Sequence, residues 1–205
     1  KQLNFNYVIK PTGLCSGKGV YVSGIHFEND LEGLNYSLDI LGKGQSVLIE
    51  EKLIGNEFTF MSYSDGTYLS HMPIVLDFKL LESGNKGPNT GSMGCITHKT
   101  HGAPFLNKED ILLVQRINKK TIDLLKKKYN KKYKGFIYGS YIKCNDTGNI
   151  KVIEFNARYG DPECINVLEL LETNLFDIYM AILNENLKNL SVNYKNETII
   201  SKYLV

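Results

Sequence analysis

The sequence lacks the features that mark disulfide-bonded, zinc-binding or membrane-spanning proteins. Its 205 residues include four cysteines, and no two of them form a C-x-x-C pair. Scattered cysteines of this kind are typical of reduced thiols in a cytosolic protein, so we expect neither a disulfide framework nor a zinc site. The sequence contains no signal peptide and no run of about 18 apolar residues, so we predict no membrane partner and a cytoplasmic location.

A strong excess of charge of either sign is also missing. The formal net charge is +2 at pH 7, which gives no indication of nucleic acid or a membrane surface as a partner. A composition of 42% hydrophobic and 22% charged residues is that of an ordinary globular protein. The chain begins at Lys1 without Met and ends at Val205 inside an apolar run, so we expect it to be a piece of a longer protein.

Glycine is concentrated in the segment "GLCSGKGV", Gly13 to Val20, which resembles a phosphate-binding loop. It does not match the P-loop pattern G-x-x-x-x-G-K-[ST], because Lys18 is followed by Gly19. Strand-like runs flank the segment on both sides, at Tyr7–Lys10 and at Val20–Gly24. Two strands around a glycine-rich turn predict a hairpin, unlike the strand, loop and helix of a P-loop.

The rest of the sequence alternates helical and extended patterns. Helical spacing of apolar residues, with Leu31, Leu34, Leu38 and Leu41 as the first example, predicts helices over 29–41, 107–129, 162–171 and 173–187. Extended runs predict a strand over 46–53 and hairpins over 57–72, with its turn at Asp65-Gly66, and over 135–156. Residues 82–104 are rich in glycine and predict a long loop. This mixture predicts an α+β fold with a largely antiparallel sheet.

The segment "VIEFNARYGDPE" is a candidate metal site. Residues two apart in a strand share a face, so Glu154 and Asn156 project together, while Ile153 and Phe155 face the opposite side, which we expect to be buried. A carboxylate and an amide oxygen at this spacing suit Mg²⁺, with phosphates and water completing the coordination. An isolated E-x-N is more often an ordinary half-buried strand. Charged residues that follow at once favour the functional interpretation, namely Arg158, Asp161 and Glu163.

Two further segments offer groups for a nucleotide or an anion. Backbone groups near Glu51 and Leu53 would suit an adenine edge, and Glu57 would suit ribose hydroxyls. Taken alone, however, this segment is better explained as a strand end with solvated charges. The loop Gly84–Gly94 supplies glycine amides, and "LDFK" before it places Asp77 and Lys79 on one face. A flexible surface loop is the alternative for Gly84–Gly94.

In order and spacing, four blocks resemble the ATP-grasp superfamily: "VIKPTGLCSGKGV", "VLIEEKLIGNE", "GPNTGSMG" and "VIEFNARYGDPE". The third and fourth are most similar to the glycinamide ribonucleotide synthetase family. The resemblance implies an ATP-grasp fold with a small flap subdomain containing a hairpin and a larger, mostly antiparallel sheet packed with helices. It divides the chain into residues 1–55, 56–187 and 188–205, the last being the start of a C-terminal segment.

The resemblance also implies roles for individual residues. ATP would be bound by Lys10, Gly13, Gly17, Lys18, Gly19, Glu50, Glu51, Leu53 and Glu57. Mg²⁺ or Mn²⁺ would be held by Glu154 and Asn156. Glycine and phosphoribosylamine would lie near Asp77, Lys79, Asn89, Thr90, Arg158 and Asp161. Lys18 and Arg158 would be the catalytic residues, neutralising charge on the transferred phosphoryl group.

The activity that the resemblance implies is ATP-dependent joining of glycine to phosphoribosylamine through a glycyl phosphate, a step of purine biosynthesis. The chain departs from the family at "DFKL", where Phe78 and Leu80 replace the His and Arg of the family's "DHKR". This departure keeps open another ATP-grasp ligase of a carboxylate and an amine. A nucleotide-binding remnant without catalysis is a second alternative, which rests only on the family's N-terminal and C-terminal domains being missing from this sequence. Fusion to other domains of the pathway is also open.

Overall fold

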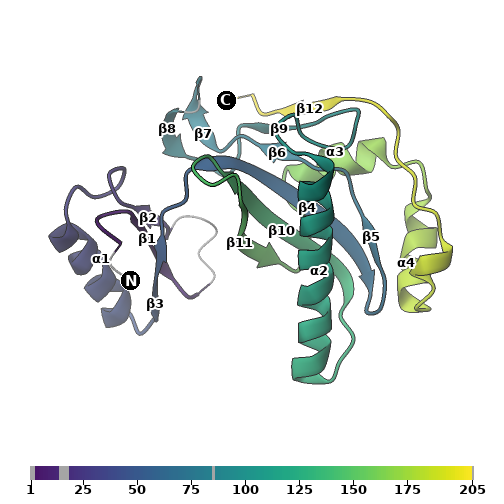
Figure 1. Ribbon diagram of the computed structural model, residues 1–205, viewed down its shortest axis with the longest axis horizontal. Helices are drawn as coiled ribbons and strands as arrows, with labels where there is room; N and C mark the ends of the chain where they lie inside the picture. Colours follow the sequence, from purple (N-terminus) through teal and green to yellow (C-terminus); the bar gives the residue numbers. More distant parts are fainter. Residues whose placement is uncertain (1–2, 14–18, 85, 205) are drawn as a thin grey trace. The chain divides into compact units, whose positions relative to one another are not determined.

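The computed structural model describes residues 3–13, 19–84 and 86–204, and it divides into two compact units. Unit 1 is Lys1–Ile54 and unit 2 is Gly55–Val205 (Figure 1). Every pair of neighbouring strands is antiparallel within the described residues, which also form four α-helices. The predicted α+β class is therefore confirmed.

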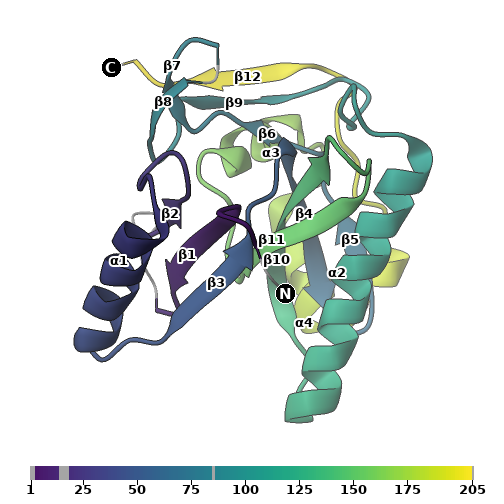
Figure 2. The ribbon, with the colours of Figure 1, turned by 60° about the vertical axis from the view of Figure 1, so that its left-hand side comes forward.

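Unit 1 is a three-stranded sheet with one helix. Its sheet has the order β2-β1-β3, and its elements are β1 (Tyr7–Pro11), β2 (Tyr21–Val22), α1 (Asp30–Gly42) and β3 (Val47–Glu51) (Figure 2). The predicted pairing of the strands on either side of the glycine-rich segment is confirmed, because Val8 lies opposite Val22. The core of the unit consists of Ile9, Phe27 and Ile40.

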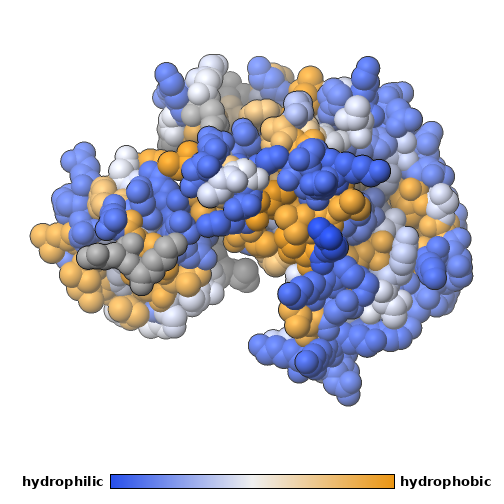
Figure 3. Space-filling view, in the orientation of Figure 1, coloured by the Kyte–Doolittle hydropathy of each residue, from blue (hydrophilic) through white to orange (hydrophobic). Residues whose placement is uncertain are grey.

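Helix α1 begins behind Asn29, whose side chain accepts a hydrogen bond from the Glu32 amide at 3.0 Å. The helix packs closely on the sheet at Gly33, where a Cβ atom would lie 2.8 Å from the Tyr7 hydroxyl. The leucines whose spacing predicted this helix are exposed, at 53–66% of their surface: Leu31, Leu34, Leu38 and Leu41. Figure 3 shows hydrophobic surface on this unit. The period predicted the helix correctly, but it did not identify the buried face.

Unit 2 is built around a four-stranded sheet of order β11-β10-β4-β5 (Figure 1). The strands are β4 (Gly55–Asp65), β5 (Leu69–His71), β10 (Lys134–Cys144) and β11 (Ile150–Asn156). Both predicted hairpins are present, and Gly66, with φ of 89°, adopts the left-handed conformation in the turn between β4 and β5.

Helices cover both faces of this sheet. Helix α2 (Lys108–Tyr129), with a capping box formed by Asn107 and Asp110, buries Val114, Asn118 and Ile122 at intervals of one turn. On the opposite face, α3 (Glu163–Leu170) and α4 (Leu175–Leu183) pack on a core with Met61, Tyr63 and Tyr138. The predicted helix over 173–187 is shorter, and a 3₁₀ turn, η1 (Leu187–Asn189), follows it.

The segment 82–104 is not the continuous loop that its glycines predicted. It contains β8 (Lys86–Asn89), which pairs with β7 (Leu80–Glu82), and β9 (Gly94–Thr97), which lies between β6 (Leu76–Asp77) and β12 (Ile199–Lys202). Glycines adopt positive φ here: Gly84 lies in the turn after β7, and Gly87 lies within β8, where the backbone still pairs with β7.

Residues 188–205, expected to begin a separate C-terminal segment, lie within unit 2. Strand β12 of this segment pairs with β9 in the sheet that also contains β6. None of the helices in the described part of the chain is long and apolar enough to cross a membrane.

Candidate active site

A β-bulge in the edge strand β11 places Glu154 and Asn156 on the α3 and α4 face of the sheet. Along β10, Tyr141 lies opposite Val152, whereas Ser140 lies opposite Glu154, so Ile153 is the extra residue. An extra residue reverses the alternation of side chains on one side of the bulge. Glu154 and Asn156 therefore share a face with Ser140 and Tyr138, as the spacing predicted.

The expectation that Ile153 and Phe155 face a buried side is wrong for Phe155. The ring of Phe155 packs edge-on against Tyr141, with centroids 6.3 Å apart, but it remains 38% exposed. Because β11 is the edge strand of the sheet, Phe155 has a neighbouring strand on only one side.

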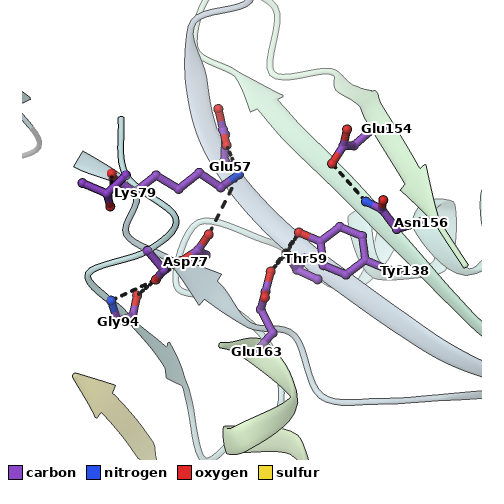
Figure 4. Close-up of polar contacts among 11 residues, drawn as sticks. Glu57, Thr59, Asp77, Lys79, Gly94, Tyr138, Glu154, Asn156 and Glu163 are labelled. Atoms are coloured by element: carbon purple, nitrogen blue, oxygen red, sulfur yellow. Dashed lines mark hydrogen bonds and ion pairs between the residues drawn. The ribbon is translucent and has the colours of Figure 1, made fainter. Parts of the chain in front are cut away.

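The second part of the candidate site is a small recess where β6 and the residues after it lie against β4. The recess is lined by Glu57, Phe58, Thr59, Asp77, Lys79 and Ser140 (Figure 4). Lys79 Nζ lies 3.3 Å from Glu57 Oε2 and 3.9 Å from Asp77 Oδ2. The structure thus brings together Glu57, predicted to bind ribose, and two residues predicted to bind the other substrates.

Charges in the recess are coupled. Burial raises the pKa of Asp77 to about 6; the hydrogen bond from Ser92 opposes this shift and the negative charge of Glu163 adds to it. Burial lowers the pKa of Lys79, but the carboxylates of Glu57 and Asp77 outweigh burial, so its net shift is upward. Lys79 is therefore a cation at neutral pH.

The loop that was predicted to bind an anion makes contacts at Thr90 and Ser92 that hold the recess in shape. The Thr90 amide and hydroxyl both donate to the Lys79 carbonyl oxygen, at 2.7 and 2.8 Å. The Ser92 hydroxyl donates to Asp77 Oδ1 at 2.6 Å and accepts from the Gly94 amide at 2.9 Å. Asn89 lies in β8. The donors of Thr90 and Ser92 are thus used within the protein.

The side chains of Phe78 and Leu80, the two residues that differ from the family motif, point away from the recess. Phe78 and Leu80 alternate with Asp77 and Lys79 along the chain, so their side chains leave the backbone on the other side. They line a separate groove of about 700 Å³, together with Leu81, Met93 and Tyr203. Phe78 is 51% exposed there.

Glu163 was seen in the sequence only as part of a cluster of charges, and its position is unexpected. Its side chain is 2% exposed, and Oε1 accepts hydrogen bonds from Tyr138 at 2.8 Å and from Thr59 at 2.9 Å (Figure 4). Burial and the charge of Glu163 raise the pKa of Tyr138, so its hydroxyl remains a donor. No sequence signal identifies such a contact, because Thr59 and Glu163 are 104 residues apart.

Two other predicted substrate residues lie nearby in sequence but outside this network. Arg158 is exposed and donates from Nη1 to the Tyr159 carbonyl oxygen at 2.8 Å. Asp161 is exposed and accepts a hydrogen bond from the Tyr203 hydroxyl at 3.1 Å. Within the described residues, no hydrogen bond or ion pair joins either of them to Asp77 or Lys79.

In unit 1, the structure brings together two of the predicted ATP residues. Lys10 Nζ forms an ion pair with Glu50 Oε2 at 2.5 Å, because Lys10 and Glu50 lie on adjacent antiparallel strands. Glu51 is exposed at the end of β3, and Leu53 is half-buried two residues later. Gly13 is exposed before the glycine-rich segment, and the Gly19 carbonyl oxygen accepts from the Tyr36 hydroxyl at 3.0 Å. Gly17 and Lys18 lie outside the described residues.

The structure contains a Ser–His contact, which the sequence gave no reason to expect. Ser62 Oγ lies 2.8 Å from His71 Nδ1, but Ser62 is fully buried between β5 and α2. Asn118 Nδ2 donates a second hydrogen bond to Ser62 Oγ at 3.1 Å, so this hydroxyl is held from two sides. No substrate can reach this serine, and we conclude that the pair is structural.

The residues at the bulge fit a hard divalent cation. Within the described residues, no group of three or more His, Cys, Asp or Glu side chains could hold a metal, so a protein-only metal cage is absent there. Glu154 and Asn156 supply two oxygen donors on one face, and Asn156 Nδ2 donates to Glu154 Oε1 at 3.0 Å. Two protein oxygens leave positions for phosphate oxygens and water, which is the coordination that Mg²⁺ prefers.

Comparisons with solved structures identify the class of this fold. The chain is similar to the crystal structure of a phosphoribosylamine–glycine ligase from Thermotoga maritima, with a TM-score of 0.79, 29% identity, and coverage of 97% of this chain and 49% of that one. It also shares its fold with an N5-carboxyaminoimidazole synthase from Aspergillus clavatus in complex with ADP and 5-aminoimidazole ribonucleotide, at a TM-score of 0.60, 13% identity, and coverage of 90% and 42%. A family model whose description includes the ATP-grasp domain matches residues 1–164, so the fold is an ATP-grasp fold.

The chain belongs to the family described as phosphoribosylglycinamide synthetase, ATP-grasp (A) domain. It is 39% identical over 202 residues to a phosphoribosylamine–glycine ligase of Methanothermobacter thermautotrophicus, covering 97% of this chain and 45% of that protein. It is 40% identical over 197 residues to the ligase of the same name from Methanosarcina barkeri, covering 96% of this chain and 45% of that protein. The chain therefore spans a little under half the length of these relatives.

Proposed function

We propose that this chain carries the ATP-grasp part of a phosphoribosylamine–glycine ligase, which joins glycine to 5-phosphoribosylamine with cleavage of ATP to ADP and phosphate. The observation that carries the proposal is the 39–40% identity to curated ligases of that name over nearly the whole chain. The matched region contains Glu154 and Asn156, the proposed metal ligands, and the recess around Asp77 and Lys79.

The proposed reaction has two steps. An oxygen of the glycine carboxylate attacks the γ-phosphorus of ATP, the bond to the β,γ-bridging oxygen breaks, and ADP leaves. The amine of phosphoribosylamine then attacks the carbonyl carbon of glycyl phosphate, loses a proton, and expels phosphate. Neither step uses a side-chain nucleophile, which agrees with the complete burial of Ser62.

Unit 2 would bind the metal and the amino-acid substrate in this proposal. Glu154 and Asn156 would hold Mg²⁺ or Mn²⁺, which when bound would neutralise negative charge on the phosphates. Asp77 and Lys79 would orient glycine and phosphoribosylamine. Thr90 would act on the site by holding the Lys79 backbone, and Asn89 would be a further substrate contact. Arg158 is exposed and carries a fixed positive charge, and it would stabilise the transferred phosphoryl group together with Lys18.

Residues of unit 1 would bind the nucleotide. The ammonium group of Lys10 would contact phosphates, and Gly13, Gly17, Lys18 and Gly19 would cover them with backbone amides. The end of β3, with Glu50, Glu51 and Leu53, would bind adenine. Glu57, which belongs to β4 of unit 2, would accept hydrogen bonds from ribose, in competition with its ion pair to Lys79.

The main alternative is another ATP-grasp ligase of a carboxylate and an amine. It depended on Phe78 and Leu80, which replace a His and an Arg of the family motif. Since these side chains line the separate groove, they leave the composition of the recess unchanged. This observation favours the glycine ligase.

The test is an ADP-release assay on the full-length protein with Mg²⁺, ATP, glycine and phosphoribosylamine. Release of ADP that requires both glycine and phosphoribosylamine, with formation of glycinamide ribonucleotide, is the expected result. ADP release with other carboxylates or amines but not with this pair would overturn the proposal. Binding of ATP without turnover of any acceptor would indicate a remnant without catalysis.

A further inference from the structure

Glu163 is a buried carboxylate that the proposed function does not use. It is the first residue of α3, and its side chain is 2% exposed. The chain is shaped around it at Gly160, where an added Cβ atom would lie 2.4 Å from Glu163 Oε2 and 2.8 Å from the Tyr138 ring. Only glycine leaves room for the carboxylate at this position.

The burial of this charge is not explained by an ion pair. Among the described residues, no Lys, Arg or His side chain forms an ion pair with Glu163. Its neighbours are the hydroxyls of Thr59 and Tyr138 and the N-terminal end of α3, which favours negative charge. Thr59 Oγ1 and Tyr138 OH are 3.0 Å apart, so they could bond to each other without Glu163. An apolar residue would avoid the desolvation cost of the carboxylate.

Thr59 and Tyr138, whose hydroxyls contact Glu163, lie in line across the sheet with the proposed metal ligands Glu154 and Asn156. On the sheet, Thr59 is opposite Ser140, which is opposite Glu154, and Tyr138 is opposite Asn156. Glu163 thus contacts one residue in each of two rows of paired residues across the sheet. The first row is Thr59, Ser140 and Glu154, and the second contains Tyr138 and Asn156. Figure 4 shows Glu163 below Thr59 and Tyr138, with Asp77 to one side and the metal pair to the other.

Thr59 also connects to the recess. Its amide donates to the Val75 carbonyl oxygen at 2.8 Å, and the Val75 amide donates back at 3.1 Å. Val75 precedes β6, which carries Asp77, and the Thr59 side chain is part of the lining of the recess. The contact between Thr59 and Glu163 therefore fixes the wall of the recess as well as the middle of the sheet.

We propose that Glu163 is a positioning residue: through the hydroxyls of Thr59 and Tyr138, its Oε1 atom fixes the separation between the Asp77–Lys79 recess and the Glu154–Asn156 pair. The inference rests on the proposed function, in which these two places hold the attacking carboxylate and the phosphate that it attacks. Rates of such transfers depend steeply on alignment, and a displacement of about 1 Å costs on the order of 100-fold. Binding of each substrate depends on its own contacts and is affected much less.

The test compares two substitutions at Glu163 in the full-length protein. Glu163→Gln keeps an acceptor at Oε1, the atom that receives both hydroxyls, whereas Glu163→Met keeps the length of the side chain and removes the acceptor. We expect Glu163→Met to lower kcat by ~30- to 100-fold, with KM for ATP and for glycine within about threefold of wild type. Glu163→Gln should retain kcat within about fivefold.

A double-mutant cycle tests whether Glu163 acts through Tyr138. Tyr138→Phe removes one of the two donors and keeps the ring, and it should lower kcat less than Glu163→Met does. If the two residues act as a unit, combining both substitutions should lower kcat little further than Glu163→Met alone. Glu169→Gln, at an exposed position of the same helix, is the matched control and should leave kcat unchanged.

Three outcomes would overturn the inference: a kcat of Glu163→Met near that of wild type, an increase of KM with unchanged kcat, or full additivity with Tyr138→Phe. Loss of kcat only in proportion to the loss of folded protein, measured by thermal unfolding, would show a merely structural role and also overturn it. Failure of the proposed function is distinct, because it appears as absence of glycine-dependent turnover in the wild-type protein.

Discussion

Asn156 Nδ2 donates a hydrogen bond to Glu154 Oε1 at 3.0 Å, between two residues that share one face of an edge strand. The contact orients the Asn156 amide so that its oxygen points away from the carboxylate. Both ligand oxygens are therefore held on the same face before a cation binds. The two-residue period of the strand puts both side chains on one face, and the bulge at Ile153 decides which face, since it places Glu154 opposite Ser140.

We predict that Glu154→Gln lowers metal-dependent turnover of the full-length protein by ~100-fold or more, because the only anionic ligand of the pair is lost. Since Glu154 is exposed, its free energy of unfolding should change by less than about 1 kcal/mol. Kinetics as a function of Mg²⁺ concentration and urea unfolding measure the two effects. Glu109→Gln, at an exposed position of α2, is the control, and wild-type kinetics of Glu154→Gln would disprove the metal assignment.

A second prediction concerns the two departures from the family motif. Because Phe78 and Leu80 line the groove and not the recess, restoring the motif with Phe78→His and Leu80→Arg should change kcat/KM for glycine by less than about threefold. The matched substitution in the recess, Lys79→Met, should lower kcat/KM for glycine by ~100-fold, because it removes the one cation among the described residues that line the recess. A large gain in kcat/KM from restoring the motif would show that the groove takes part in substrate binding.

His71 is expected to make the protein sensitive to acid. Burial lowers its pKa to about 4 from an ordinary value of 6.5, so below pH 6.5 the unfolded chain binds a proton that the folded protein does not. Stability from this residue is thus fully present above pH 6.5 and is lost as pH falls toward 4. The loss amounts to about 3 kcal/mol.

The variant His71→Gln tests this prediction, since glutamine does not titrate. It should unfold more readily than wild type at pH 7, because the Ser62 contact is weakened. Between pH 7 and pH 4 its free energy of unfolding should fall by about 3 kcal/mol less than that of wild type. Parallel pH profiles of the two proteins would contradict the assignment of His71 as a partly buried, neutral histidine.

Asp65 is predicted to be a key residue for the stability of unit 2. Oδ1 accepts from the Thr67 amide and hydroxyl at 2.8 Å and from the Tyr68 amide at 2.7 Å, and Oδ2 accepts from the Leu187 amide at 3.1 Å. Burial raises the pKa of Asp65, but these hydrogen bonds outweigh burial and lower it. The carboxylate thus joins the turn after β4 to η1 near the end of the chain.

Asp65→Asn should therefore destabilise the protein by about 1–3 kcal/mol, because an amide NH₂ group replaces one of the acceptor oxygens. The measurement is urea unfolding at pH 7. Asp146→Asn, which changes a carboxylate that accepts one hydrogen bond in an exposed turn, is the control and should cost less than about 0.5 kcal/mol. Equal effects of the two substitutions would show that the contact to Leu187 contributes nothing.

The sequence predicted the local elements well where a local cause produces them. Asn29 and Asn107 cap the two helices whose starts they predicted, and the turn at Asp65-Gly66 joins β4 to β5. The faces of Asp77 and Lys79, and of Glu154 and Asn156, followed from the two-residue period of strands. These features depend on residues close in sequence, and their physical causes act within one turn or one strand.

The short strands within 82–104 could not be predicted, because β9 forms only where β6 and β12 meet it, and β12 lies about a hundred residues further along the chain. The exposure of the α1 leucines could not be predicted either, because it too depends on segments that are distant in the sequence. A helical period shows that a face is apolar, while the neighbours available to cover that face are decided by the tertiary fold.

The amino-acid sequence by itself determined the class of this protein and the residues proposed for binding a nucleotide, a metal and an amino acid, because these depend on residue type and short spacing. Only the tertiary structure decided which of these groups meet. It paired Lys79 with Glu57, turned Phe78 and Leu80 into a separate groove, and buried Glu163 against Thr59. Contacts between residues so far apart in the chain arise from the packing of whole strands and helices, which no short pattern encodes.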